Sequence, residues 1–225
     1  MADDTQFAQA RDQMMAEITA LVIFNCARLG KAGLNRHVME VMAEVPRHEF
    51  VPTELQAYAY ADTPLPIGCG KTISQPFIVA TMTDLLEPKP TDRVLDIGTG
   101  LGYQTAILSR LVAEVYSIEL IESLALRARQ RLGRLGCANV QQRVGNGHFG
   151  WPEKAPFDKI IVTAAPQELP PALLEQLAPG GRMVLPAGPP ESQHLMVVDK
   201  AADGSVTTRN ILAVRFSVLE DAAPR

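Results

Sequence analysis

The chain has 225 residues, of which 47% are hydrophobic and 20% charged, as expected for one well-buried globular domain. Its net charge of -4 argues against a general nucleic-acid binder. The longest apolar run, residues 20–24, is too short to span a bilayer, and the acidic start is unlike a signal peptide. Three scattered cysteines without a C-x-x-C pair predict a metal-free cytoplasmic protein. We therefore expect neither a membrane nor a nucleic-acid partner.

The first third of the chain is expected to form helices and then irregular structure. Residues from about 8 to 44 carry apolar side chains at mostly helical spacing. Residues 50–73 are rich in Pro, Gly and Tyr and predict irregular structure. Ser74 has the position of a helix N-cap, with Pro76 in the first turn of a helix through Leu86. This pattern predicts an N-terminal helical and loop extension over residues 1–75, packed on a core formed by residues 76–225.

From Arg93 onward, strand and helix patterns alternate, which predicts an α/β protein with a doubly wound sheet. Asp203-Gly204 predicts a turn between the last two strands, which would then form an antiparallel edge pair. We expect a mostly parallel, seven-stranded, Rossmann-like sheet. The expected helices are 103–111, 121–135 and 170–178, and the expected strands are 93–97, 114–119, 139–144, 158–163, 181–186, 193–199 and 211–217.

A glycine-rich turn follows the first strand of this sheet. The segment from Asp96 to Tyr103 places glycines in a G-x-G-x-G pattern between a strand and a helix, as in nucleotide-type cofactor sites. The spacing is one residue shorter than the dinucleotide fingerprint and is usual in S-adenosylmethionine-dependent methyltransferases. The predicted cofactor-binding residues here are Asp96, Gly98, Thr99, Gly100, Gly102 and Tyr103.

The next two strand ends carry polar groups that suit adenosine. Glu119 lies about twenty residues beyond the glycines, where a carboxylate can accept both ribose hydroxyls. Asn146 and Gly147 follow the third strand, in place to meet the adenine edge. Taken singly, Glu119 could cap the following helix and Gly-Asn-Gly could be only a turn. Together, and in this order, they predict an adenosine-type cofactor, S-adenosylmethionine.

Other segments resemble the protein-L-isoaspartate O-methyltransferase family. The resemblance covers roughly residues 36–216, and Thr72-Ile73-Ser74-Gln75-Pro76 is its most specific motif. It implies a repair enzyme that uses S-adenosylmethionine to methylate the α-carboxylate of L-isoaspartyl residues in damaged proteins. The ester would let a succinimide reform and reopen partly to normal aspartate. The remaining matching segments are Val45–Arg47, Phe50–Pro52, Tyr60–Asp62, Leu65–Gly68, Asp96–Gln104, Ile160–Ala165 and Gly180–Pro186.

The resemblance implies that Ser74 is the active-site residue, and we expect its hydroxyl to position the acceptor carboxylate. A carboxylate is ionised at neutral pH, so its attack on a methyl group needs alignment rather than a general base. The alternative for Ser74 is a plain helix N-cap. We expect Thr72 and Gln75 to shape the same pocket beside the cofactor. The predicted substrate-binding residues are Leu65, Pro66, Ile67, Thr72 and Ser74.

The chain departs from the family pattern at three places. Asn146 replaces an aspartate, which predicts cofactor binding weakened on the order of 1 kcal/mol. Cys69 and Lys71 stand where glutamine is common at the second position, which we interpret as tolerated variation. The tail Arg215–Leu219 lacks the common Phe-Val-Pro-Leu ending, so acceptor specificity is open. Two alternatives remain: a methyltransferase for another carboxylate, or a non-catalytic cofactor-binding protein. We expect a monomer whose partners are isoaspartyl proteins.

Overall fold

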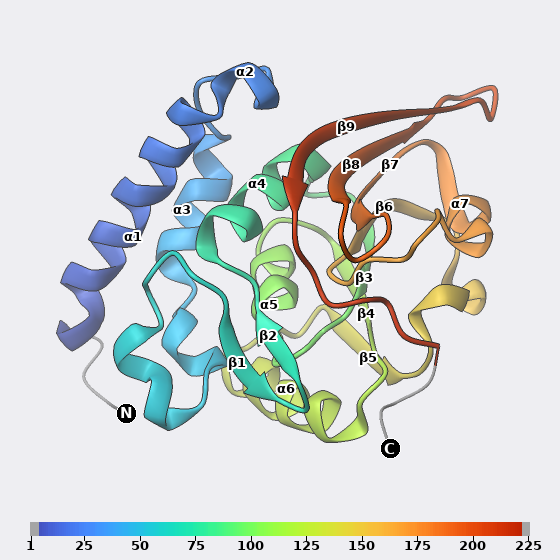
Figure 1. The fold of residues 1–225 in the computed structure, drawn as a ribbon. Coiled ribbons are helices and arrows are strands. Elements are labelled where there is room, and N and C mark those ends of the chain that lie inside the picture. Colours follow the sequence, from blue (N-terminus) through green and yellow to red (C-terminus); the bar gives the residue numbers. More distant parts are fainter. Residues whose placement is uncertain (1–4, 222–225) are drawn as a thin grey trace.

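The structure is a computed structural model that describes residues 5–221, built around a seven-stranded sheet (Figure 1). The strand order is β5-β4-β3-β6-β7-β8-β9. The first five of these strands run parallel, and β8 is antiparallel to both of its neighbours. The predicted doubly wound, mostly parallel sheet with an antiparallel end is therefore confirmed. The strands are β3 (Arg93–Ile97), β4 (Glu114–Glu119), β5 (Val140–Val144), β6 (Phe157–Val162), β7 (Leu177–Ala187), β8 (Gln193–Lys200) and β9 (Val206–Val214).

Two strands differ in extent from the sequence prediction. Strand β7 begins at Leu177, earlier than predicted, because Leu177 pairs with Phe157 before an irregularity in the register. Strand β9 spans residues 206–214 rather than 211–217, since the turn at residues 201–205 lets Val206 pair at once with Lys200. The chain leaves the sheet after Val214, which frees the following residues to line a cavity.

Helices cover both faces of the sheet. Alternate residues along a strand point to opposite faces, so Val94 and Val115 pack in one hydrophobic cluster while Leu95 and Tyr116 pack in another. The first cluster lies under α4 (Pro76–Leu86), α5 (Tyr103–Ser109) and α6 (Glu122–Arg134). The second contains residues of α7 (Pro171–Gln176), near the 3-10 helices η3 (Gly147–Phe149) and η4 (Pro152–Lys154).

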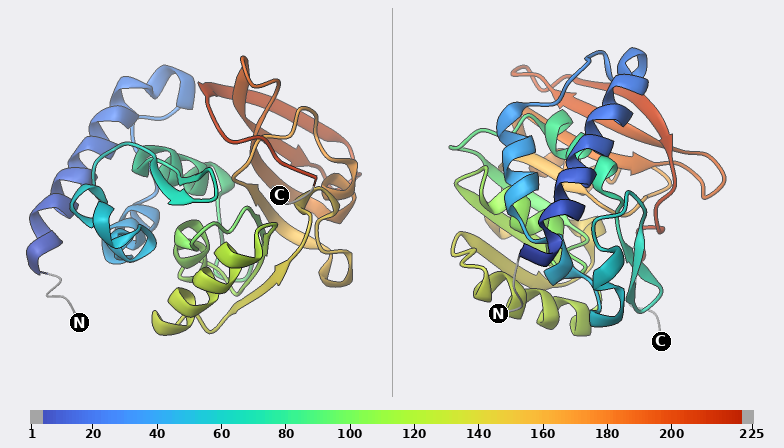
Figure 2. Two further views of the ribbon diagram at one scale, coloured as in Figure 1. Left: turned by 60° about the horizontal axis from the view of Figure 1, so that its bottom comes forward. Right: turned by 90° about the vertical axis from the view of Figure 1, so that its left-hand side faces the viewer.

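The N-terminal residues form α1 (Thr5–Phe24), α2 (Cys26–Leu29) and α3 (Arg36–Glu44), so the predicted helical region is confirmed but interrupted. The break after α1 falls at Asn25, whose side-chain amide donates to the Leu21 carbonyl (2.9 Å). Figures 1 and 2 show α1 and α3 side by side along the outside of α4. Their buried residues join the same hydrophobic cluster as the sheet. The predicted boundary between residues 75 and 76 stays a prediction.

The prediction of irregular structure over residues 50–73 is wrong in part. This region contains the 3-10 helix η2 (Thr53–Tyr58) and a hairpin of β1 (Leu65–Gly68) and β2 (Lys71–Ile73). The turn is sharp because Gly68, Cys69 and Gly70 all have positive φ (98°, 54° and 67°). Strands this short, with a proline in one of them, show no clear alternation in the sequence.

The interpretation of Ser74 as a helix N-cap is also wrong. Helix α4 begins at Pro76, and Gln75 holds the cap position without a side-chain cap bond. The cap comes from Asp62, whose carboxylate accepts from the Phe77 amide (2.7 Å) and from the Gln75 side chain (3.0 Å). A carboxylate is favourable at a helix N-terminus, so this distant side chain replaces the local one. Ser74 is thereby left outside the helix.

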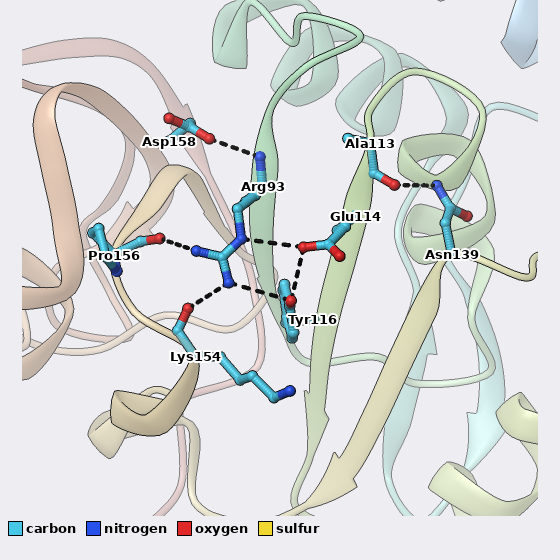
Figure 3. Close-up of polar contacts among 8 residues, drawn as sticks. All are labelled: Arg93, Ala113, Glu114, Tyr116, Asn139, Lys154, Pro156 and Asp158. Atoms are coloured by element: carbon cyan, nitrogen blue, oxygen red, sulfur yellow. Dashed lines mark hydrogen bonds and ion pairs between the residues drawn. The ribbon is translucent and has the colours of Figure 1, made fainter.

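A polar cluster joins β3 and β4 at their amino ends (Figure 3). The Arg93 guanidinium donates to Glu114 (3.1 Å), to the Tyr116 hydroxyl (3.2 Å) and to the carbonyls of Lys154 (2.9 Å) and Pro156 (3.0 Å). Its carbon lies 5.3 Å from the centre of the Tyr116 ring. Arg93 therefore ties two strands to the loop that precedes β6.

We predict that Arg93→Met lowers the free energy of unfolding by about 2 kcal/mol, because several charge-assisted hydrogen bonds are lost together. Chemical denaturation measures the change. Arg129→Met, at an exposed arginine on α6, is the control and should change stability by less than about 0.5 kcal/mol. Equal effects of the two substitutions would show that the cluster contributes no stability of its own.

Candidate active site

A cavity of about 510 Å³ opens at the carboxyl ends of β3, β4 and β6. The strand order changes direction between β3 and β6, which is where open α/β sheets bind ligands. The hairpin β1–β2 and the segment 213–220 form further walls of the cavity. The predicted site residues that line it are Ile67, Thr72, Ser74, Gln75, Gly98, Thr99, Gly100, Tyr103, Glu119 and Gly147; Leu65, Pro66, Asp96, Gly102 and Asn146 do not.

Two glycines of the loop after β3 have conformations that require glycine. Gly98 has a φ of 95°, and a Cβ there would lie 2.5 Å from the Thr163 hydroxyl. Gly102 has a φ of 101° and begins α5, where a Cβ would lie 3.2 Å from Leu132 of α6. Gly98 thus allows Thr163 to pack closely against the loop after β3, whereas Gly102 allows α5 to pack on α6.

Asp96 lies behind the loop and is fully buried. It accepts from the hydroxyls of Thr105 (2.6 Å) and Ser117 (3.0 Å). Burial raises the pKa of Asp96 to about 6, against these two hydrogen bonds, and Glu119 adds to the rise. The carboxylate thus links β3, β4 and α5 directly beneath the loop.

Glu119 ends β4 and lies almost wholly buried at the cavity wall. One carboxylate oxygen accepts from the Gly100 amide (2.7 Å) and the other from the Ile121 amide (3.0 Å). Burial raises the pKa of Glu119, and these backbone bonds oppose the rise. Each carboxylate oxygen keeps a second acceptor position, so the group can still accept from a ligand.

The loop after β5 places Asn146 and Gly147 differently. Gly147 lines the cavity beneath Ile97, whose side chain a Cβ at position 147 would overlap. The Asn146 side chain caps η3 by accepting from the His148 amide (2.8 Å), and it donates to the Asp221 carbonyl (2.8 Å). Asn146 therefore holds the loop and the chain end together at the edge of the cavity.

Ser74 lies half-buried in the cavity wall between β2 and α4. Among residues 5–221 its hydroxyl has no protein hydrogen-bond partner, which leaves it available to a ligand. Its carbonyl accepts from Arg47 (2.7 Å), a fully buried residue that also donates to the Ala59 carbonyl (2.7 Å). The Arg47 guanidinium carbon lies 4.8 Å from the centre of the Tyr103 ring. Arg47 thus holds Ser74 against the helix that follows the glycine loop.

Our site predictions from the sequence did not include Arg47 or Asp62, and they gave the tail Arg215–Leu219 only as a segment that bears on acceptor specificity. Arg47 and Asp62 lie in segments that resemble the family. The sequence therefore pointed to these segments, but it did not predict what the two side chains contact. The segment 213–220 lines the cavity because it crosses from β9 to the loop after β6, with Val218 bridged to Ala165. No local pattern in the sequence predicts such a crossing.

We predict that Asp96→Asn changes the pH dependence of stability. Because the folded-state pKa is raised to about 6, the folded protein gains stability as Asp96 takes up a proton below that pH, and loses it as pH rises through 6. Asparagine cannot titrate. The stability of the wild type relative to Asp96→Asn should therefore increase by about 2 kcal/mol between pH 7 and pH 4.5.

Urea unfolding of the ligand-free proteins at several pH values measures this difference. An Asp203→Asn variant, at an exposed turn, is a control in which the pKa is lowered and the slope should have the opposite sign. A constant difference between wild type and Asp96→Asn would mean that Asp96 has an ordinary pKa.

The glycine loop, the carboxylate at the end of β4 and the cavity at the reversal point define a class I, S-adenosylmethionine-dependent methyltransferase. The family model described as protein-L-isoaspartate(D-aspartate) O-methyltransferase matches residues 25–223. The chain belongs to this family, whose members carry out S-adenosylmethionine-dependent methylation in protein repair.

Individual relatives support the same assignment. The chain is 62% identical to protein-L-isoaspartate O-methyltransferase 1 of Polaromonas sp. strain JS666, over 98% of this chain and 94% of the relative. It is 54% identical to protein-L-isoaspartate O-methyltransferase 2 of Syntrophobacter fumaroxidans, over 96% of this chain and 87% of the relative. A solved protein-L-isoaspartate O-methyltransferase matches with a TM-score of 0.79 and 29% identity, covering 95% of this chain and 67% of that one.

A second solved structure is a putative protein-L-isoaspartate O-methyltransferase from Plasmodium falciparum, in complex with S-adenosyl-L-homocysteine. It matches with a TM-score of 0.73 and 25% identity, covering 89% of this chain and 97% of that one. Within residues 5–221, no helix is both long and apolar enough to cross a membrane.

Proposed function

We propose that this cavity transfers a methyl group from S-adenosylmethionine to the α-carboxylate of L-isoaspartyl residues in peptides and damaged proteins. The observation that carries the proposal is that the Ser74 hydroxyl shares one cavity with the glycine loop and Glu119. An acceptor held by Ser74 would therefore lie in the same space as a cofactor held by the loop.

The cavity fits an adenosine-type cofactor. Its volume of about 510 Å³ is within the usual range of small-molecule sites. Glu119 offers acceptor positions to a ribose, and the adjoining glycine loop lines the same cavity. On the expected adenine side, Gly147 lets the Ile97 side chain pack directly against the loop after β5, where a Cβ would lie 2.3 Å from Ile97. When bound, S-adenosylmethionine supplies a sulfonium methyl group, which carries the transferred carbon.

We infer that Ser74 positions the acceptor. With one oxygen of the acceptor carboxylate held by the Ser74 hydroxyl, the other would be free to take the methyl group that the cofactor supplies. The cofactor would be left as a neutral thioether, so no residue of the protein would have to move a proton. Arg47 fixes the Ser74 backbone, while Ile67 and Phe216 add apolar walls that exclude water from the acceptor carboxylate.

The remaining assignments follow from the composition of the chain. Cys26, Cys69 and Cys137 are all free thiols, which suits a reducing compartment, and we propose the cytoplasm. We also propose that the enzyme works as a monomer.

The test is methyl transfer from labelled S-adenosylmethionine to two peptides that differ only in an isoaspartyl or a normal aspartyl linkage. We expect transfer to the isoaspartyl peptide alone, because only in that linkage is the α-carboxylate free. In a normal aspartyl residue the α-carboxyl group forms the peptide bond. Transfer to neither peptide, with S-adenosylhomocysteine still bound, would instead indicate another carboxylate acceptor or a non-catalytic protein.

Two substitutions separate the two halves of the site. Ser74→Ala should lower kcat at least tenfold while the Kd for S-adenosylhomocysteine stays within about twofold, because the hydroxyl contacts only the acceptor. Glu119→Ala should weaken S-adenosylhomocysteine binding about tenfold or more, since the ribose hydroxyls lose a charged acceptor. Calorimetry and initial rates measure both. A large loss of cofactor affinity in Ser74→Ala would assign Ser74 to the cofactor instead.

A further inference from the structure

A further groove, of about 400 Å³, lies between the hairpin β1–β2 and helix α6, next to the active-site cavity. Its walls are residues 52–55, residues 66–68 of β1 and two arginines of α6. Ile67 lines both the groove and the cavity. Its side chain points at the glycine loop, since a Cβ at Gly100 would lie 3.1 Å from its Cδ1 atom. Its carbonyl accepts from Arg127 (3.4 Å), so strand β1 borders both the cavity and the groove.

The two arginines of the groove, Arg127 and Arg131, lie one helical turn apart, so their side chains emerge on the same face of α6. Both guanidinium groups donate to backbone carbonyls: Arg127 to Ile67, and Arg131 to Glu49 (2.7 Å) and to Arg127 (3.1 Å). Within residues 5–221 neither arginine forms an ion pair with a carboxylate. The Glu49 carboxylate pairs with Arg134 instead. Two positive charges therefore meet in the groove without a negative partner.

The other residues of the groove do not balance this charge. Among the described residues that line it, Glu54 is the one acid, and it is exposed and paired with neither arginine. The pKa of Arg131 is lowered, by burial first and then by the charges of Arg127 and Arg134. A bound anion would relieve this repulsion and supply charge-assisted hydrogen bonds. The chain as a whole has a net charge of -4, so the groove is a local concentration of positive charge.

The position of the groove indicates what would bring an anion to it. The proposed acceptor is a residue within a polypeptide, so the chain on both sides of it has to leave the cavity. The sequence predicted Pro66 as a substrate-binding residue, and Pro66 lines the groove rather than the cavity. An extended peptide advances about 3.3 Å per residue, so about two to four residues are enough to cross one strand. A peptide whose acceptor lies in the cavity can therefore reach the groove over β1.

We propose that Arg127 and Arg131 form a docking site for an acidic side chain of the acceptor polypeptide, about two to four residues from the isoaspartyl residue. A carboxylate suits the site because it can accept from both guanidinium groups at once. Pro52, Leu55 and Pro66 add apolar surface for the rest of the peptide. The inference deepens the proposed function and rests on it: isoaspartyl residues in acidic segments would be the preferred substrates.

Methyl-transfer kinetics with paired isoaspartyl peptides test the proposal on the full-length chain. The peptides of a pair differ only in a glutamate or a glutamine, placed two, three or four residues before or after the isoaspartyl residue. At the best position the KM of the glutamate peptide should be about three- to tenfold lower than that of the glutamine peptide. The kcat values should be equal, because the arginines do not touch the reacting atoms. High salt should reduce the difference in KM.

Substitutions on α6 locate the preference. In a double variant, Arg127→Gln with Arg131→Gln, the KM values of the two peptides should become equal. Arg127→Lys keeps the charge and should keep part of the preference, since a single ammonium replaces the planar guanidinium. Arg129→Gln, at an exposed arginine of α6 outside the groove, is the matched control and should keep the full preference. Each preference is a ratio within one variant, so a general loss of activity cancels.

Three results would overturn the proposal. Equal KM values for every pair in the wild type would remove the acidic preference while leaving transfer to isoaspartyl peptides intact. A preference that survives in the double variant would place the recognition of the acid elsewhere on the protein. An equal loss of preference in Arg129→Gln would mean that the total charge of α6, and not the groove, attracts acidic peptides. Absence of transfer to any isoaspartyl peptide would instead contradict the proposed function on which the docking site rests.

Discussion

The site depends first on the hydrogen bond from the Gly100 amide to Glu119. This bond ties the loop after β3 to the end of the neighbouring strand, together with the bonds from the Gly98 and Thr99 amides to the Ile118 carbonyl (2.9 and 3.2 Å). Because both groups stand at the carboxyl edge of a parallel sheet, their spacing is set by the ladder between β3 and β4. Asp96 reinforces the arrangement from below by accepting from Thr105 and Ser117. A buried carboxylate with a raised pKa is an unfavourable group to place there, and its two hydroxyl donors offset only part of that cost.

The surroundings of Ser74 are held together by residues that lie far apart in the sequence. Asp62 caps α4 and Arg47 holds the Ser74 carbonyl, so Ser74 is fixed through its backbone while its hydroxyl stays available. A positioning hydroxyl needs this arrangement, because a hydroxyl that capped the helix would have its oxygen engaged by the backbone. The role proposed for Ser74 thus depends on the cap being supplied by another residue.

The sheet could be predicted from the sequence because its strands are buried and β-rich, and the glycine loop because its spacing is specific. The hairpin β1–β2 could not, since its strands are short and its turn depends on Cys69 adopting a positive φ. Gly102 and Asn146 show a subtler limit. Both lie in motifs that predict ligand contact, yet Gly102 packs on Leu132 and Asn146 caps η3. A motif indicates which segment forms a site, whereas the direction of each side chain depends on tertiary neighbours.

Two of the residues by which this chain departs from the pattern of its family contact the same short segment of the chain. Lys71 pairs with Glu220, and Asn146 donates its amide to the Asp221 carbonyl, so both act on the chain end that follows the altered tail. An aspartate at position 146 could not make that donation when ionised, because a carboxylate only accepts. Asparagine therefore suits this particular chain end, because its amide can make the contact that an ionised aspartate could not. Lys71 and Asn146 thus hold the segment after Leu219 from two sides, whereas the Thr72–Pro76 motif around Ser74 keeps the family pattern.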